Sequence, residues 1–277
     1  MNRFLIVLLI AGCCLPVFSQ SYDEWIDSSF KYLDQQDLIA AEESLKQALR
    51  KEPANPRNIL LLSNLGVIQQ KLGKWDDALL SYTSALDRSP QQTTLLSNRA
   101  NLYLEMGYPD KALADYTILL AIDGQHEEAL YRRGLLYLAQ KDYLAAKADF
   151  NKIVEVNPNT LNGRKGIATL CKLRGDYSDA EKIYIFLISR VPEDADLYLG
   201  RAELYLMMKR NNHALSDVNK AISLETKTGR KDPYAYILRA RIKILQHEKQ
   251  PAQKDIEQAV AAGYDKEKAA ELLKSCK

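Results

Sequence analysis

The feature that most constrains this chain of 277 residues is an alanine that recurs every 34 residues. Five alanines follow one another at that spacing, and insertions of three and four residues bring one more on each side into the same register. The seven are Ala41, Ala78, Ala112, Ala146, Ala180, Ala214 and Ala252. A period of this length is typical of repeat architectures, in which each unit packs on its neighbours. The period therefore predicts one elongated repeat domain rather than the two domains that length alone suggests.

Each repeat alanine belongs to a set of residues at constant spacing. A second small residue precedes it by twelve places, as at Gly66 and Gly134, and a large apolar residue follows it by four. In four units that large residue is aromatic: Tyr82, Tyr116, Phe150 and Tyr184. Small residues at both places let two helices approach closely, and the large side chain fills the space beside their crossing. We therefore expect each unit to be a hairpin of two helices, helix A and helix B, broken near its fifteenth place by Gly73, Gly107 or Lys141.

This pattern resembles the tetratricopeptide repeat. The unit that shows it best carries Leu130, Gly134, Tyr137, Ala146, Phe150 and Pro158. The resemblance implies an all-α, right-handed solenoid of about seven helical hairpins over residues 20–266. The predicted repeats are 22–55, 59–92, 93–126, 127–160, 161–194, 195–228 and 233–266. We expect residues 267–277 to form a helix that caps the exposed end of the array.

Residues 1–19 have the composition of an export signal, with an apolar stretch too short to cross a bilayer as a helix. Two processing routes are open. The first is cleavage before Gln20, and the second is lipoprotein processing at Cys13, because the segment from Ile10 to Cys13 matches a lipobox. We favour simple cleavage, since the residues after Cys13 stay apolar where a lipoprotein tether is normally polar. Either route predicts an exported, periplasmic or envelope-associated protein, and the second an outer-membrane lipoprotein.

The composition argues against several classes of function. The 38 basic and 36 acidic residues leave a net charge of +2, which disfavours nucleic acid as a partner. The three histidines fall in different repeats without helical spacing, so the sequence predicts no zinc site. No cofactor, nucleotide or nucleophile motif is present in the sequence. We therefore predict a protein that is not an enzyme and has no cofactor, metal or evident small-molecule substrate.

Three smaller features carry predictions of their own. Outside the signal, we expect Cys171 to be a small buried residue and Cys276 a thiol at a fraying terminus. The polar insertion from Thr226 to Pro233 reads as an exposed turn whose basic residues could touch an acidic surface.

The resemblance also implies that helix A residues at the second, fifth, sixth, ninth and twelfth places of each repeat line a concave groove that binds an extended peptide or a partner's helix. The predicted groove residues are Asn64, Asn98, Asn101, Tyr131, Arg132 and Lys165. Asparagine amides can bond a peptide backbone whatever its side chains, and Arg132 and Lys165 could hold a carboxylate. The carboxylate clamp by which some family members hold chaperone tails is not expected. Ser63, Val67 and Glu128 depart from its pattern, and Glu128 would repel an acidic tail.

Two functional hypotheses follow. The first is a non-catalytic exported scaffold that binds a protein or peptide in its groove and helps assemble or tether an envelope complex. The alternative is a structural component, anchored to lipid through Cys13, that self-associates through its convex face or ends. Contact with a membrane is expected only if Cys13 is acylated.

Overall fold

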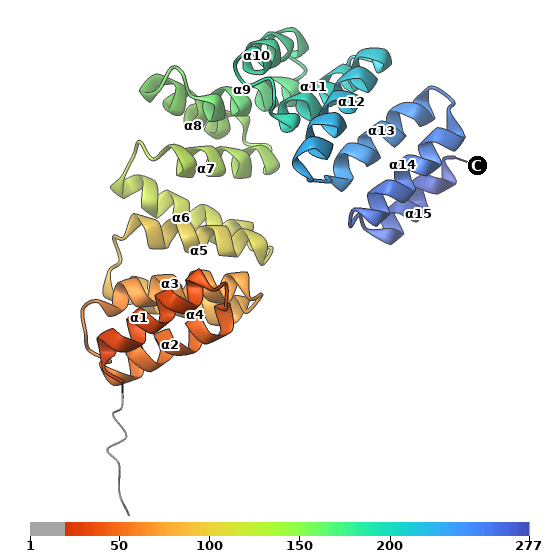
Figure 1. The fold of residues 1–277 in the computed structure, drawn as a ribbon. Helices are drawn as coiled ribbons and strands as arrows, with labels where there is room; N and C mark the ends of the chain where they lie inside the picture. The colour runs from red at the N-terminus through yellow and green to blue at the C-terminus, as the bar shows by residue number, and fades with distance from the viewer. Residues whose placement is uncertain (1–19, 277) are drawn as a thin grey trace, which may run out of the picture. The chain divides into compact units, whose positions relative to one another are not determined.

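The computed structural model describes residues 20–276, which form fifteen α-helices and no β-strand (Figure 1). The helices are α1 (Tyr22–Asp34), α2 (Leu38–Lys51), α3 (Asn58–Lys71), α4 (Trp75–Arg88), α5 (Thr93–Glu105), α6 (Pro109–Ile122), α7 (Glu127–Ala139), α8 (Tyr143–Val156), α9 (Leu161–Arg174), α10 (Tyr177–Arg190), α11 (Ala195–Met207), α12 (Asn211–Thr228), α13 (Pro233–Leu245), α14 (Lys249–Ala261) and α15 (Lys266–Lys274). None of the helices in this range is both long and apolar enough to span a bilayer. The predicted signal, with Cys13, lies outside the described residues.

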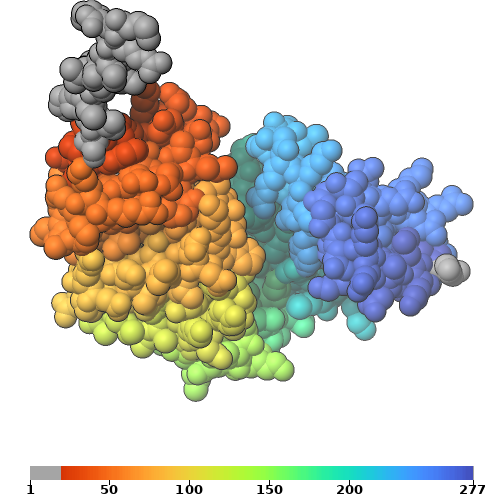
Figure 2. All heavy atoms as spheres, turned by 90° about the horizontal axis from the view of Figure 1, so that it is seen from below, coloured from red at the N-terminus to blue at the C-terminus, as the bar shows by residue number. Residues whose placement is uncertain are grey.

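Helices α1 to α14 form seven successive pairs, one for each predicted repeat, with α3 beginning one residue before its predicted repeat. The prediction of an all-α helical repeat fold is therefore confirmed. The two helices of a repeat pack on each other, as α1 does on α2 and α11 on α12. The chain divides into two compact units, Met1–Asp115 and Tyr116–Lys277. In the space-filling view the helices of the first unit follow in chain order from red to yellow (Figure 2). The prediction of one continuous domain stays a prediction.

Each hairpin turns through a residue in the left-handed conformation at the fifteenth place of its repeat. These residues are Gly73, Gly107, Gly175, Gln36, Lys141, Lys209 and His247, with φ between 58° and 87°. After α1, the Gln36 amide donates to the Leu33 carbonyl at 3.0 Å and the Asp37 amide to the Tyr32 carbonyl at 2.9 Å. This pair of bonds satisfies carbonyls that the helix end would leave open. Four of the seven repeats therefore hold a side chain in a conformation that favours glycine.

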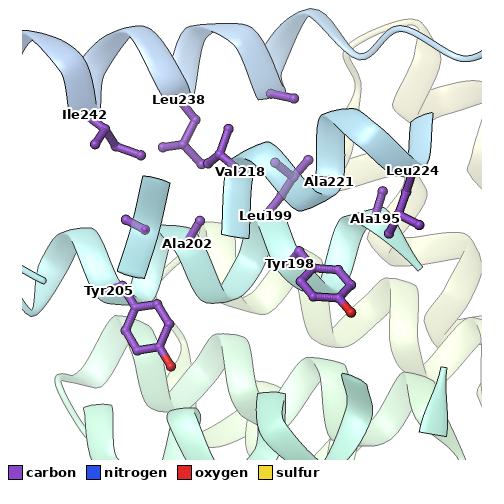
Figure 3. Close-up of a cluster of buried hydrophobic side chains, with 12 residues drawn as sticks. Ala195, Tyr198, Leu199, Ala202, Tyr205, Val218, Ala221, Leu224, Leu238 and Ile242 are labelled. Carbon is purple, nitrogen blue, oxygen red and sulfur yellow. The ribbon is translucent and has the colours of Figure 1, made fainter. Parts of the chain in front are cut away.

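Small residues inside each repeat are matched to large ones. All seven repeat alanines are fully buried. A Cβ atom added to Gly66 would lie 2.5 Å from the Tyr82 ring, and one added to Gly134 would lie 2.5 Å from the Phe150 ring. Glycine is therefore required at these places for the aromatic ring to lie against helix A. Figure 3 shows the corresponding layer where α11, α12 and α13 meet, with Ala202 and Val218 buried between the helices.

Buried ion pairs join the two helices of four repeats, a feature that the sequence analysis missed. An arginine at the seventh place binds an aspartate at the twenty-third place through two hydrogen bonds. The pairs are Arg99–Asp115, Arg133–Asp149, Arg201–Asp217 and Arg239–Asp255, with distances of 2.6 to 3.0 Å. The fifth repeat instead has Ile167 and Ile183 at these places. Arginine and aspartate are thus both present or both absent, because a buried carboxylate requires a partner.

The C-terminal segment differs in part from its prediction. Helix α15 forms where a capping helix was expected, and Ala269 packs against Ala252 and Ile256 of α14. Cys276 was predicted to be a fraying thiol, and this prediction is wrong, because its side chain is buried in the same cluster. Cys171 was expected to be buried and is half-buried. Both thiols are free.

The polar insertion after the sixth repeat also differs from its prediction. Residues Thr226 to Thr228 continue α12 rather than forming a turn, and the helix ends at Gly229 with φ of 74°. Residues Arg230 and Lys231 are exposed, whereas Asp232 is half-buried at the start of α13. The helix extends because its helical hydrogen bonds continue until glycine supplies the left-handed cap.

Candidate functional site

A pocket of about 390 Å³ lies within the second unit. Its walls come mainly from the first helices of four successive repeats, α7, α9, α11 and α13, with Tyr184 added from α10. Most of its lining residues occupy the second, fifth, sixth, ninth or twelfth place of a repeat. These are the places that the family resemblance assigns to the groove. The pocket is therefore the candidate binding site.

The structure brings two of the six predicted groove residues into this pocket. Tyr131 and Lys165 both line it. The Lys165 Nζ atom lies 2.6 Å from Asp194 Oδ2, so its charge is already paired within the protein. Arg132 is likewise paired, with its Nε atom 2.6 Å from Glu128 Oε1, and it does not line the pocket. The sequence analysis expects both cations to hold a partner's carboxylate. In the structure each is instead paired with a carboxylate of the protein itself.

The three predicted asparagines belong to the first unit. Asn64 lies on α3, and Asn98 and Asn101 lie on α5. Asn64 is exposed, and the two others are half-buried. Their proposed role in binding a peptide backbone stays a prediction.

The pocket also holds a charged network that the sequence analysis missed. Lys172 is buried and donates to Glu203 Oε2, and the Tyr234 hydroxyl donates to Glu203 Oε1. Glu203 therefore links α9, α11 and α13. Only Lys172 is buried, and Glu203 keeps 29% of its side chain exposed, but a carboxylate that is hydrogen-bonded on both oxygens still orients the helices that carry its partners. The predicted groove register, continued into the sixth and seventh repeats, would have found Glu203 at the ninth place and Tyr234 at the second.

Three tyrosines give the pocket its aromatic character. Burial raises the pKa of Tyr184 to about 12, although a hydrogen bond with Thr169 opposes the shift. Burial also raises the pKa of Tyr131, against the nearby charges of Lys165 and Arg132. The pKa of Tyr234 is raised by burial and further by its bond to Glu203. All three phenols thus stay protonated near neutral pH, and each offers an apolar ring with a polar hydroxyl.

Gly200 leaves space in this pocket beside Tyr184. A Cβ atom added to Gly200 would lie 2.7 Å from the Tyr184 hydroxyl oxygen. Gly200 occupies the sixth place of its repeat, where a side chain would stand in the groove. Because Gly200 has no side chain, the Tyr184 hydroxyl can reach the pocket between α9 and α11.

The chemistry of this pocket suits binding. Its two lysines are paired with carboxylates. Tyrosine rings, amphipathic and with few rotatable bonds, are common anchors at protein interfaces.

Comparison with known proteins agrees with this architecture. Residues 61–94, 127–160 and 174–233 each match the tetratricopeptide repeat. The crystal structure of a tetratricopeptide repeat protein from Parabacteroides merdae ATCC 43184 is 48% identical, covers 93% of this chain and 99% of its own, and has a TM-score of 0.86. The chain therefore belongs to the tetratricopeptide repeat family. Proteins of this family are generally non-catalytic scaffolds for protein interaction.

More distant structures share the fold. YrrB, a tetratricopeptide repeat protein with an unusual peptide-binding site, is 18% identical, covers 67% of this chain and 94% of its own, and has a TM-score of 0.51. PilF of Pseudomonas aeruginosa is 15% identical, covers 78% of this chain and 96% of its own, and has a TM-score of 0.57. At these identities the likeness concerns the fold alone.

Proposed function

We propose that this protein is an exported, non-catalytic scaffold that binds a protein or peptide through the pocket formed by α7, α9, α11 and α13. The proposal extends to a role in assembling or tethering a complex of the cell envelope. The observation that carries it is the convergence of Tyr131, Tyr184 and Tyr234 with paired charges in one open pocket. Binding of a peptide by YrrB, which has the same fold, supports a peptide as the occupant.

The pocket offers aromatic rings and hydroxyl groups to a bound partner. The tyrosine rings provide apolar area at little cost in side-chain entropy, and their hydroxyls can bond a peptide backbone. The Lys172–Glu203–Tyr234 network holds three helices in place before a partner arrives. A site that is ordered in advance loses less entropy on binding. This pocket can therefore recognise an extended segment without rearranging.

Site-specific photo-crosslinking in the source cell tests the proposal. A photoreactive amino acid replaces Tyr131 in one variant and Leu144 in the control, because Leu144 is highly exposed on α8 and does not line the pocket. We expect the Tyr131 variant to capture a protein that the Leu144 variant does not. Thr169→Trp, which fills the pocket, should abolish this capture, whereas Ser178→Trp on the exposed start of α10 should leave it unchanged.

Two results would contradict the proposal. One is equal capture from Tyr131 and Leu144, and the other is capture that persists in Thr169→Trp with its helicity intact. The predicted groove residues of α5 and α7 have their own test, in which Asn98→Ala with Arg132→Ala should reduce capture.

Export is tested separately. The intact mass of the protein from its source distinguishes a chain that begins at Gln20 from one that begins at an acylated Cys13. A mass that includes residues 1–19 unmodified would refute export by either route.

A further inference from the structure

Three carboxylates meet at the edge of the pocket, where α11 begins and α12 connects to α13. They belong to Asp196, Glu225 and Asp232, and one oxygen of each lies within 4.8 Å of those of the other two. Asp196 and Asp232 also line the pocket. Three negative charges this close repel one another unless a cation lies among them.

Glu225 is the buried member of this cluster. Glu225 is 3% exposed, and its Oε2 atom accepts a hydrogen bond from the Asp232 amide at 3.2 Å. Its Oε1 atom is buried and has no hydrogen-bond partner among the described residues. A buried carboxylate oxygen without a partner is costly, and the desolvation raises the pKa of Glu225. The Oε1 atom has only an ion-pair contact with Arg230 at 3.7 Å and no hydrogen bond, so it can accept a further ligand.

Arg230 shows where that oxygen is directed. Its guanidinium nitrogens lie 3.5 Å from Asp196 Oδ1, 3.7 Å from Glu225 Oε1 and 3.7 Å from Asp232 Oδ2. The three carboxylates thus lie around one guanidinium group. Arg230 is 56% exposed, is too distant for a hydrogen bond to any of them, and supplies one positive charge against three negative ones. A more compact cation can approach all three oxygens more closely.

We propose that Asp196, Glu225 and Asp232 bind a calcium ion at the edge of the pocket. Calcium takes oxygen ligands at about 2.3–2.6 Å, so two oxygens on opposite sides of one ion are about 5 Å apart. The observed separations fit within that span. Magnesium, with ligands at about 2.1 Å, demands a tighter octahedral shell and retains its waters. Zinc prefers nitrogen and sulfur ligands, and the cluster contains neither.

Calcium would move Arg230 into solvent and order the start of α13. Asp232 is the N-cap of α13, where its side chain accepts a hydrogen bond from the Tyr234 amide at 2.8 Å. An ion bound to Asp232 and Asp196 therefore ties α13 to α11 beside Tyr234. Calcium bound here would set the position of one aromatic wall of the pocket. This inference does not depend on the proposed function, because calcium binding is measured without a partner.

Isothermal titration calorimetry of the purified chain with calcium chloride tests the site. With three protein carboxylates, we expect a single site with a Kd of about 10⁻⁴ to 10⁻³ M, as in extracellular calcium modules. Asp196→Asn, at an exposed position, should weaken binding by about tenfold or more. Arg230→Gln should strengthen it by about tenfold, since it removes the competing charge. Glu193→Gln, an exposed acid outside the cluster, is the matched control and should leave the Kd unchanged.

Several outcomes would overturn the proposal. One is the absence of calcium binding in both the wild type and Arg230→Gln, which would make the cluster a structural ion pair of Arg230. Another is magnesium binding as tight as calcium binding. A third is a Kd that Glu193→Gln changes as much as Asp196→Asn does. If circular dichroism shows that Asp196→Asn is misfolded, Asp232→Asn replaces it, because asparagine also caps helices.

Discussion

The ion pair between Arg133 and Asp149 allows a quantitative test of how the two helices of one repeat are held together. Asp149 is 5% exposed and accepts two hydrogen bonds from Arg133, at 2.9 and 2.7 Å. Asp149→Ala leaves the guanidinium among buried groups without its partner, and breaking a buried pair costs about 3–5 kcal/mol. The Arg133 side chain keeps 18% of its surface exposed and can reach water, so we expect the lower end, about 3 kcal/mol. In a chain of this size, that loss lowers the melting temperature by about 6–12 °C.

The matched control copies the fifth repeat, which has isoleucine at both of the corresponding places, Ile167 and Ile183. The double variant Arg133→Ile with Asp149→Ile buries no unpaired charge, and we expect its stability within about 1 kcal/mol of the wild type. Thermal melts followed by circular dichroism at one protein concentration compare the three proteins. If Asp149→Ala melts like the wild type, or if the double variant is as unstable as the single one, the ion pair does not stabilise the repeat in this way.

Three further predictions concern the repeat framework and use the same melts. Lys141→Gly should stabilise the protein by about 0.5–1 kcal/mol, because Lys141 turns the hairpin with φ of 62°; a lower melting temperature would contradict this. Because burial raises the pKa of Tyr184 from 10.0 to about 12, the folded state keeps this proton between pH 10 and 12 while the unfolded state releases it. Stability should therefore fall with rising pH in that interval, and the fall should be smaller in Tyr184→Phe; an equal fall would exclude Tyr184 as a cause. Ala146→Leu should destabilise the protein by about 1–3 kcal/mol through overpacking, and Tyr116→Ala by about 3–5 kcal/mol through a cavity. Unchanged melting in both would show that the repeat register is wrong.

The candidate site could be predicted from the sequence only in part. The groove places, counted from the repeat alanines, identified Tyr131 and Lys165, and the structure puts both in one pocket. The same count did not show that Lys165 is paired with Asp194, 29 residues further along the chain. It also did not reveal Glu203 as the acceptor for both Lys172 and Tyr234, because each belongs to a different repeat. Charge pairing between repeats depends on side-chain direction, which spacing alone does not specify.

The regular spacing of small residues by itself determined the helical hairpins and their register. A residue at the eighth place and one at the twentieth can meet only if two helices cross there, so Gly66 and Ala78 already imply the packing around Tyr82. Tertiary structure alone decided which polar groups find partners. Asp196 comes from the start of α11, whereas Glu225 and Asp232 lie at the end of α12 and the start of α13, and only folding brings their charges within reach of one another. The packing of the core recurs every 34 residues because each layer has the same shape. Electrostatic pairing depends instead on the particular charges that each layer carries.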